Sequence, residues 1–272
     1  MNFKQNLHTH SVYCDGKDTL EGIILTAIEK GFDSIGFSSH SYMKYATYRC
    51  LTPESTEEYI NEINELRLKY ADKIKIYCGI EYEFDSEVDL KDFNYTIGAV
   101  HTLKLDGIYY DVDWTLKRTE NVINKFFDGN GLRYAKAYYE RLAELPKQGR
   151  FDILAHFDLV SKFQDKKELF DEDSKEYKYA VTEAIESLKG KIPYFEVNTG
   201  AISRGYRKMP YPSPYIVKEL RRLGFGAVIT SDCHNKDCLD CGFDIAERLL
   251  LDCGFKERYV LTDNGFKPII IK

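Results

Sequence analysis

The feature that most constrains the fold of this chain is an alternation of short β-rich runs with longer amphipathic stretches. Most of the β-rich runs carry apolar residues at consecutive positions, which is typical of parallel strands covered by helices. They lie around Leu7 and at 34–40, 73–84, 95–101, 151–158, 193–200 and 226–234. Helical patterns occur between them, at 19–32, 52–71 and 213–226. This alternation predicts parallel strands joined by right-handed crossovers.

Two of the helical stretches begin with a recognisable start signal. Thr52 precedes Pro53, and Ser213 precedes Pro214. A hydroxyl residue followed by proline suits an N-cap and the first position of a helix. The charged run at 165–178, by contrast, is interpreted as a solvated helix face or a loop.

The number of units favours one closed architecture. Seven or so strand–helix units predict an α/β fold, either a closed or a nearly closed β/α barrel; an open, doubly wound sheet is the alternative. No Ser-, Gly- or Pro-rich linker divides the chain, so residues 1–272 are expected to form a single domain. Barrels of this kind commonly reach about 250 residues. In either fold the chemistry belongs at the C-terminal ends of the strands.

Composition excludes several classes of partner. The net charge of −6 argues against a nucleic-acid-binding surface, which needs dense Lys and Arg. No apolar run approaches the roughly 20 residues of a membrane span, and no signal-peptide core follows Met1. Seven scattered cysteines suit reduced thiols, and the Cys238-x-x-Cys241 pair is interpreted as structural. We therefore expect a cytoplasmic protein without a membrane partner, and composition favours no particular oligomeric state.

The six histidines point to a metal centre. Every one lies at or just past the C-terminal end of a predicted strand, where strand ends of a barrel meet at one rim. They are His8, His10, His40, His101, His156 and His234, and the carboxylates of Asp15, Glu81 and Asp232 occupy similar places. An ion such as zinc takes three or four protein ligands and leaves a place for water. The donors therefore suit two to three divalent ions, of Zn, Mn or Fe.

These residues in this order resemble the polymerase and histidinol phosphatase (PHP) superfamily. Its motifs appear as His8-Thr9-His10 with Asp15-Gly16, as Ser39-His40, as His101 after Glu81, and as Asp232-Cys233-His234 after His156. The resemblance implies a distorted (β/α)7 barrel with three metal sites. It implies a first ion on His8, His10, Glu81 and Asp232, a second on Glu81, His101 and His156, and a third on Asp15, His40 and His234.

Within the superfamily the chain is most similar to the monofunctional histidinol-phosphate phosphatases of histidine biosynthesis. The similarity lies in "EVNTGAISRGYRKMPYPSP" (196–214) and "VHTLKLDGIYYDVDW" (100–114). It implies hydrolysis of the phosphate monoester L-histidinol phosphate to L-histidinol and phosphate. Arg204 or Arg207 would occupy the basic position of the first segment, with Arg204 favoured, and Trp114 is a candidate wall for the imidazole. The alternative is a phosphoesterase or phosphodiesterase acting on another small phosphorylated substrate or a nucleotide.

The expected mechanism follows from the donor types. Bound cations lower the pKa of water from 15.7 to about 7 and draw charge from phosphoryl oxygens, which predicts attack by a metal-bound hydroxide. Arg204 is expected to donate a planar pair of hydrogen bonds to the phosphate, and Asp232 or His234 to move a proton to the leaving alkoxide.

Further carboxylates and a non-enzymatic alternative also bear on the predicted function. The Asp111-x-Asp113 pair resembles an aspartyl-phosphate motif but lacks its companion pattern. Asp158 and Glu83 are candidates to contact the substrate amino group. A non-enzymatic module with a vestigial site is disfavoured, because all nine donor positions are filled.

Overall fold

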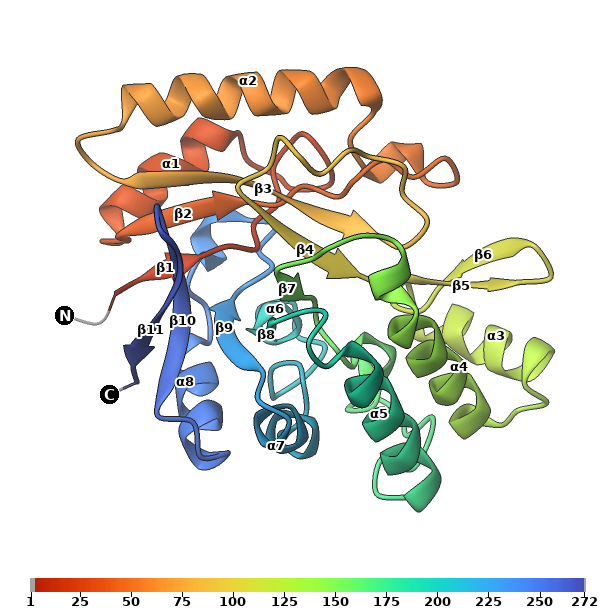
Figure 1. The fold of residues 1–272 in the computed structure, drawn as a ribbon. Coiled ribbons are helices and arrows are strands. Elements are labelled where there is room, and N and C mark those ends of the chain that lie inside the picture. Colours follow the sequence, from red (N-terminus) through yellow and green to blue (C-terminus); the bar gives the residue numbers. More distant parts are fainter. Residues whose placement is uncertain (1–2, 272) are drawn as a thin grey trace.

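Seven parallel strands curve into a barrel in the computed structural model, which describes residues 3–271 (Figure 1). The strands are β1 (Gln5–Asn6), β2 (Ser34–Phe37), β3 (Lys75–Glu83), β4 (Tyr95–Ala99), β7 (Ile153–Leu154), β8 (Tyr194–Asn198) and β9 (Gly226–Thr230), in that spatial order. Every neighbouring pair in this order is parallel. The prediction of parallel strands is therefore confirmed.

The two edges of this sheet meet at the C-terminal rim. Thr9, just after β1, forms a parallel bridge with Cys233, just after β9. The backbone N–H of His10 donates to the carbonyl of Cys233 over 2.9 Å. The architecture is thus a nearly closed (β/α)7 barrel, as predicted, and the open doubly wound alternative is wrong.

Helices cover the outside of the barrel. In Figure 1, α1 (Leu20–Glu29) and α2 (Pro53–Lys69) lie over β2 and β3. The opposite side is covered by α4 (Gly131–Ala143), α5 (Lys175–Leu188), α7 (Pro214–Arg222) and α8 (Phe243–Asp252). Two further helices are α3 (Leu116–Phe126) and the short α6 (Gly200–Ser203), and single turns of 3-10 helix occur at Thr47–Arg49, Leu145–Lys147, Leu159–Ser161 and Lys236–Cys238. Within residues 3–271, no helix is both long and apolar enough to cross a membrane.

The start of α2 shows how local sequence sets a helix boundary. The hydroxyl of Thr52 accepts a hydrogen bond from the N–H of Ser55, and the hydroxyl of Ser55 accepts one from the N–H of Thr52. This reciprocal capping box satisfies N–H groups that have no partner inside the helix. Pro53 then takes the first helical position, as predicted. Ser213 occupies the same position before α7, but its side chain makes no capping hydrogen bond.

The interior of the barrel is filled around the ring of Tyr95. Gly36 on β2 and Gly79 on β3 face this ring, and a Cβ atom at either position would overlap it. The absence of two side chains therefore makes room for one large aromatic residue. The phenol of Tyr95 donates to the backbone carbonyls of Leu7 and Phe37, which ties the start of β4 to the ends of β1 and β2 across the barrel interior.

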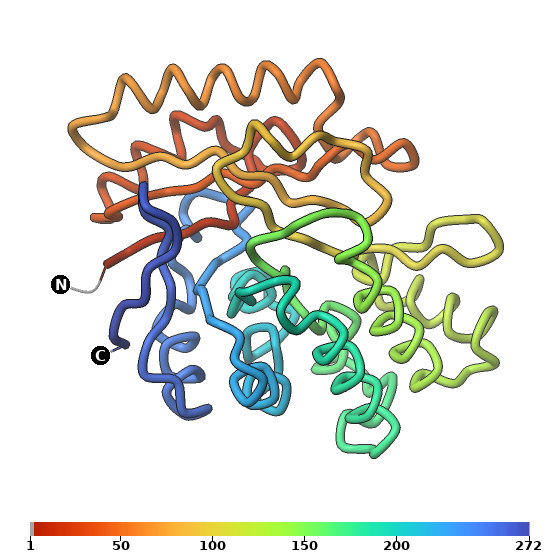
Figure 2. Tube along the Cα trace, viewed as in Figure 1, coloured from red at the N-terminus to blue at the C-terminus, as the bar shows by residue number. Residues whose placement is uncertain are grey.

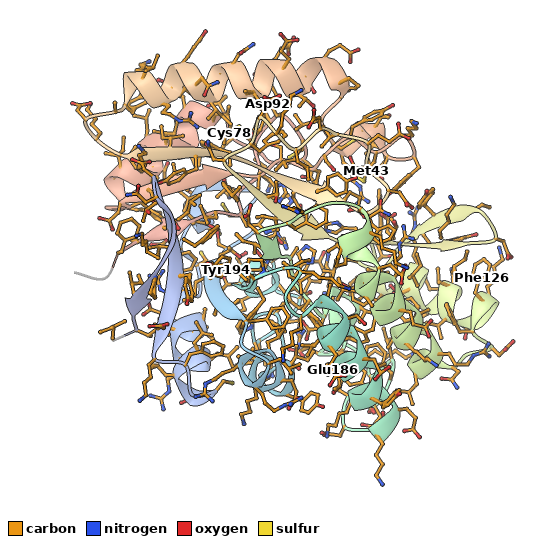
Figure 3. The ribbon with its side chains drawn as sticks, viewed as in Figure 1. Met43, Cys78, Asp92, Phe126, Glu186 and Tyr194 are labelled. Atoms are coloured by element: carbon orange, nitrogen blue, oxygen red, sulfur yellow. The ribbon has the colours of Figure 1, made fainter. Side chains whose placement is uncertain are left out.

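A C-terminal hairpin closes the other end of the barrel, beside the N-terminal segment (Figures 1 and 2). It consists of β10 (Glu257–Thr262) and β11 (Gly265–Ile270), and its Leu261 exchanges two hydrogen bonds with the amide side chain of Gln5. Tyr194, labelled in Figure 3, lies at the start of β8 and packs its ring against Tyr259 and Phe266 of the hairpin. This hairpin was not predicted from the sequence.

Other expectations differ from the structure at element ends. The predicted strands run one to four residues too far: β3 ends at Glu83, β2 at Phe37 and β7 at Leu154, so the chain leaves the sheet before His40 and His156. A second hairpin, β5 (Thr102–Leu105) and β6 (Ile108–Asp111), was also missed. The charged run 165–178 is a loop up to Ser174, after which α5 begins. All seven cysteines, including Cys238 and Cys241, are free thiols.

The role of Tyr95 in the barrel is testable by removal of its hydroxyl. We expect Tyr95→Phe to lower the free energy of unfolding by about 1–2 kcal/mol, because buried carbonyls lose a hydrogen-bond donor. Urea unfolding of metal-free protein measures this. Tyr179→Phe, at an exposed position on α5, is the matched control and should change stability by less than about 0.5 kcal/mol. Equal effects of the two substitutions would contradict the assigned role.

Candidate metal centre

The structure brings all nine predicted donors together at the C-terminal rim of the barrel. Eight of them fall into three groups whose ligand atoms lie within 4.8 Å of one another: His10 with Asp15, His40 and His234; His8 with His10 and Asp232; and His40 with Glu81 and His101. The ninth, His156, places Nε2 3.0 Å from Glu81 Oε1. Residues more than 200 positions apart thus share one site.

The carboxylate of Glu81, on β3, lies at the centre of this site. Its Oε2 is 2.7 Å from His40 Nδ1 and 3.4 Å from His8 Nε2. Its Oε1 faces His156 and, at 3.6 Å, His101 Nε2. Because its two oxygens face different imidazoles, Glu81 stands where a carboxylate bridging two ions would stand.

Two aspartates complete the donor set on the more open side. Asp15 Oδ1 lies 3.2 Å from His234 Nε2 and 3.6 Å from His40 Nε2. Asp232 Oδ1 lies 3.2 Å from His10 Nε2. His40 therefore faces Glu81 with one nitrogen and Asp15 with the other, so its ring lies between two donor groups.

The chemistry of these donors fits divalent cations. Five of their buried atoms have no hydrogen-bond partner within residues 3–271: His8 Nε2, His10 Nε2, His40 Nδ1, His156 Nδ1 and Glu81 Oε2. His40 Nδ1 and Glu81 Oε2 remain unpartnered although they are only 2.7 Å apart, so they are not aligned as donor and acceptor. Buried polar atoms without partners cost free energy. Ions coordinated by these atoms would remove that cost.

Two further carboxylates orient the imidazoles from behind. His8 Nδ1 donates to Glu196 over 2.8 Å, and His101 Nδ1 donates to Glu83 over 2.5 Å. Both glutamates are fully buried. A hydrogen bond at Nδ1 leaves Nε2 free to bind an ion and fixes the ring in place.

Glu196 also links several strands. Its carboxylate accepts hydrogen bonds from the backbone N–H of His156, the amide of Asn198 and the hydroxyl of Thr230. Glu196 was not predicted from the sequence. A charged residue inside the apolar strand "YFEVN" nevertheless indicates a buried polar contact. In the sequence analysis Glu83 was considered as a substrate contact; the structure instead places it against His101, two residues along the same strand face as Glu81.

In the protein without metal ions, burial and neighbouring charges shift the pKa values of two of these histidines in opposite directions. Burial lowers the pKa of His10 to about 3, helped by the neighbouring His234 and His40. Burial also acts to lower the pKa of His40, but the carboxylates of Glu81 and Asp15 prevail and raise it to about 10. A cation displaces the proton from such a histidine, because only the neutral ring is a ligand.

Asp232 has an unusual backbone that connects it to Arg204. Its φ of 45° lies in the left-handed region, which is uncommon for a residue with a side chain. The carbonyl of Asp232 accepts from Arg204 Nη1 over 2.7 Å, and its Oδ2 accepts from Nη2 over 3.0 Å. Burial acts to raise the pKa of Asp232, but Arg204 and His8 hold it well below its usual range. Asp232 is therefore kept as a carboxylate.

The two candidate arginines lie in different environments. The Arg204 side chain is 30% exposed at the rim, and its Nη1 is 3.1 Å from His234 Nδ1. Arg207 is buried, and its Nη1 donates to Ser161 over 2.6 Å and lies 3.4 Å from Asp158. Asp158, once considered for substrate contact, is fully buried and accepts from the N–H of Ser213. Arg207 and Asp158 thus anchor the chain segment behind the rim.

Trp114 lies outside the donor cluster. Its ring is flanked by the guanidinium groups of Arg118, at 4.7 Å, and Arg49, at 5.9 Å. The neighbouring Asp-x-Asp residues are each paired with a cation, Asp111 with Arg49 and Asp113 with Lys162. This pairing disfavours a nucleophilic role for either aspartate, in line with the sequence analysis.

Comparison with known proteins agrees with this geometry. The PHP domain family model matches residues 6–200. A probable histidinol-phosphatase of Schizosaccharomyces pombe (strain 972) is 29% identical over 275 residues, covering 91% of this chain and 86% of that protein. The histidinol-phosphatase of Bacillus subtilis (strain 168) is 26% identical over 254 residues, covering 85% of this chain and 93% of that protein.

Two solved structures share the fold. The putative histidinol phosphatase of Listeria monocytogenes has a TM-score of 0.76 at 20% identity, covering 89% of this chain and 99% of that one. The histidinol phosphate phosphatase of Lactococcus lactis subsp. lactis Il1403, complexed with Zn, L-histidinol and phosphate, has a TM-score of 0.72 at 20% identity, covering 97% and 98%. With a family model that matches well over half of its length, this chain belongs to the PHP domain family.

Proposed function

We propose that this protein hydrolyses L-histidinol phosphate to L-histidinol and phosphate, a step of histidine biosynthesis. The observation that carries the proposal is the convergence of nine imidazole and carboxylate donors with five unpartnered buried atoms among them. Support for the substrate comes from the relatives in Schizosaccharomyces pombe and Bacillus subtilis, which this chain matches over most of its length. The enzyme is a phosphoric monoester hydrolase.

The donors hold two to three divalent ions in this proposal. The first ion is assigned to His8, His10, Glu81 and Asp232, the second to Glu81, His101 and His156, and the third to Asp15, His40 and His234. The distances around Glu81 and Asp15 support this division. Zinc is favoured, because the Lactococcus lactis protein is complexed with Zn. Mn and Fe suit the same ligand types.

Different residues of the chain are assigned to phosphate binding and to proton transfer in the proposed reaction. Bound ions supply an activated water and take charge from the phosphoryl oxygens. Arg204, exposed beside the donors, binds a phosphate oxygen with its planar guanidinium. His234 and Asp232 are the two candidates to pass a proton to the departing alkoxide. The side chain of His234 is 25% exposed and that of Asp232 is 8% exposed, so exposure favours His234. Trp114 remains only a candidate for contact with the imidazole of the substrate.

The proposal takes residues 1–272 as one phosphoesterase domain working in the cytoplasm. The family match ends at residue 200, whereas Asp232 and His234 follow β9 and complete the donor set. The part of the chain beyond the match is therefore needed for the chemistry. Free thiols at all seven cysteines support a reducing compartment.

The function is tested by phosphate release from L-histidinol phosphate, with p-nitrophenyl phosphate and a phosphodiester beside it and metal content measured on the same sample. We expect kcat/KM for L-histidinol phosphate to exceed the others at least 100-fold, because an oriented substrate uses its binding energy in the transition state. His101→Ala and Asp15→Asn should abolish turnover while the protein stays folded. Equal or better hydrolysis of the phosphodiester would favour the alternative phosphodiesterase function.

The carboxylates behind the histidines predict a change in metal affinity. We expect Glu83→Gln and Glu196→Gln each to weaken zinc binding by about 10- to 100-fold, because a neutral amide supports the imidazole less well than a carboxylate does. Competition with a chromophoric chelator measures the affinity. Glu87→Gln, at an exposed residue that pairs with Lys44, is the control and should bind zinc like the unchanged protein. Unaltered affinity in both buried variants would remove their assigned role.

The phosphate contact of Arg204 predicts weaker anion binding. Inhibition by inorganic phosphate should weaken about 10- to 100-fold in Arg204→Ala, since a hydrogen bond to a charged group contributes about 1.5–3 kcal/mol. The metal content of each sample is measured in parallel, because Arg204 also contacts Asp232. Arg248→Ala, at an exposed position on α8, serves as the control. Phosphate inhibition that is unchanged in fully metal-loaded Arg204→Ala would contradict the proposal.

A further inference from the structure

The thiol of Cys14 contacts one of the metal donors from behind. Its Sγ lies 3.3 Å from Nδ1 of His10. Cys14 belongs to a tight turn in which the N–H groups of Cys14 and Gly16 both donate to the carbonyl of Ser11. A Cβ atom on Gly16 would overlap the backbone of His10, so this turn lies directly against the histidine. The sulfur is thereby held in a defined place.

The thiol contacts Nδ1 of His10 and leaves the other ring nitrogen, Nε2, free. His10 Nε2 is buried, has no hydrogen-bond partner and lies 3.2 Å from Asp232 Oδ1 and 3.6 Å from Glu81 Oε2. It therefore faces the space that the ions would fill, as Nε2 of His8 does. Neutral imidazole carries one proton, so a free Nε2 places that proton on Nδ1. The acceptor for this N–H is the sulfur of Cys14.

The kind of acceptor differs among the histidines. His8 and His101 each donate to a buried glutamate, whereas His10 donates to the sulfur of a cysteine. His10 is also common to two donor groups, and its ring lies 4.2 Å from that of His234 and 4.4 Å from that of His40. Three carboxylates already surround these rings. Cys14 thus orients His10 without the addition of a fourth carboxylate.

We propose that Cys14 is a positioning residue that holds the tautomer and the direction of the His10 ring, and thereby sets the affinity for the ions that His10 binds. The inference rests on the proposed function, in which the site holds divalent ions. A packing role does not account for the contact. Cys14 is partly exposed and belongs to none of the hydrophobic clusters in residues 3–271.

The test compares Cys14→Ala with Cys14→Ser. The alanine variant loses the acceptor, and we expect its zinc affinity to fall about tenfold, at the low end of the effect of such outer partners. The serine hydroxyl accepts the same N–H and should restore affinity to within about threefold of the unchanged protein. Chelator competition measures affinity, and the visible spectrum of cobalt-loaded protein should change in Cys14→Ala alone.

A matched control separates this role from a general effect of cysteine loss. Cys241→Ala removes another partly exposed thiol, which lies beside Cys238, and should bind zinc normally. Metal-free Cys14→Ala should unfold at the same temperature as metal-free Cys241→Ala. Unchanged zinc affinity and an unchanged cobalt spectrum in Cys14→Ala would overturn the inference. A Cys14→Ser variant that binds zinc as weakly as Cys14→Ala would also overturn it. So would a clearly lower melting temperature of metal-free Cys14→Ala, because that would indicate a packing role.

These outcomes are distinct from failure of the proposed function. If the unchanged protein takes up no zinc or cobalt after reconstitution, the metal centre and the role of Cys14 are both overturned. If it binds the ions but does not hydrolyse L-histidinol phosphate, only the substrate assignment fails. The metal-binding measurements need no substrate, so they decide the role of Cys14 independently.

Discussion

The burial of the Glu81 carboxylate among imidazoles is the constraint on which the rest of the site depends. A carboxylate removed from water is costly unless positive charge or hydrogen-bond donors surround it. Five histidine rings approach its two oxygens to within 3.6 Å. These rings come from the ends of β1, β2, β4 and β7, so the carboxylate can be balanced only if the strand ends stay in register. Divalent ions would supply the missing positive charge.

The fold and the site stabilise each other at the seam of the barrel. The rung that joins Thr9 to Cys233 also sets the separation of the His8–His10 pair from the Asp232–His234 pair. Behind the rim, Glu196 connects the His8 ring after β1, the backbone of His156 after β7 and the side chain of Thr230 on β9. Because each of these hydrogen bonds is buried, a shift of one strand would leave polar groups without partners. The donors are therefore held rigidly before any ion binds.

The groups that contact the histidines from behind differ in charge. Carboxylates support His8 and His101, a thiol supports His10, and Arg204 and the carbonyl of Asp232 lie beside His234. Negative charge thus increases toward the buried side, around Glu81, whereas the more exposed side carries the guanidinium of Arg204. A phosphate dianion approaching from solvent would meet this guanidinium at the rim, where the Asp15 carboxylate is also exposed.

The sequence by itself determined the type of fold and the donor set. Alternation of apolar runs with amphipathic stretches predicts parallel strands and helices locally, and histidines at strand ends must meet at one rim once the strands are parallel. Glu196, the supporting roles of Glu83 and Cys14, and the two hairpins were decided only by the tertiary structure. Strand register selects which side chains face each other, and it depends on contacts between residues far apart in the chain, such as Gln5 with Leu261. Arg204 and Arg207 make the same point: both follow the same strand, yet only packing at the rim exposes one and buries the other behind the ligands.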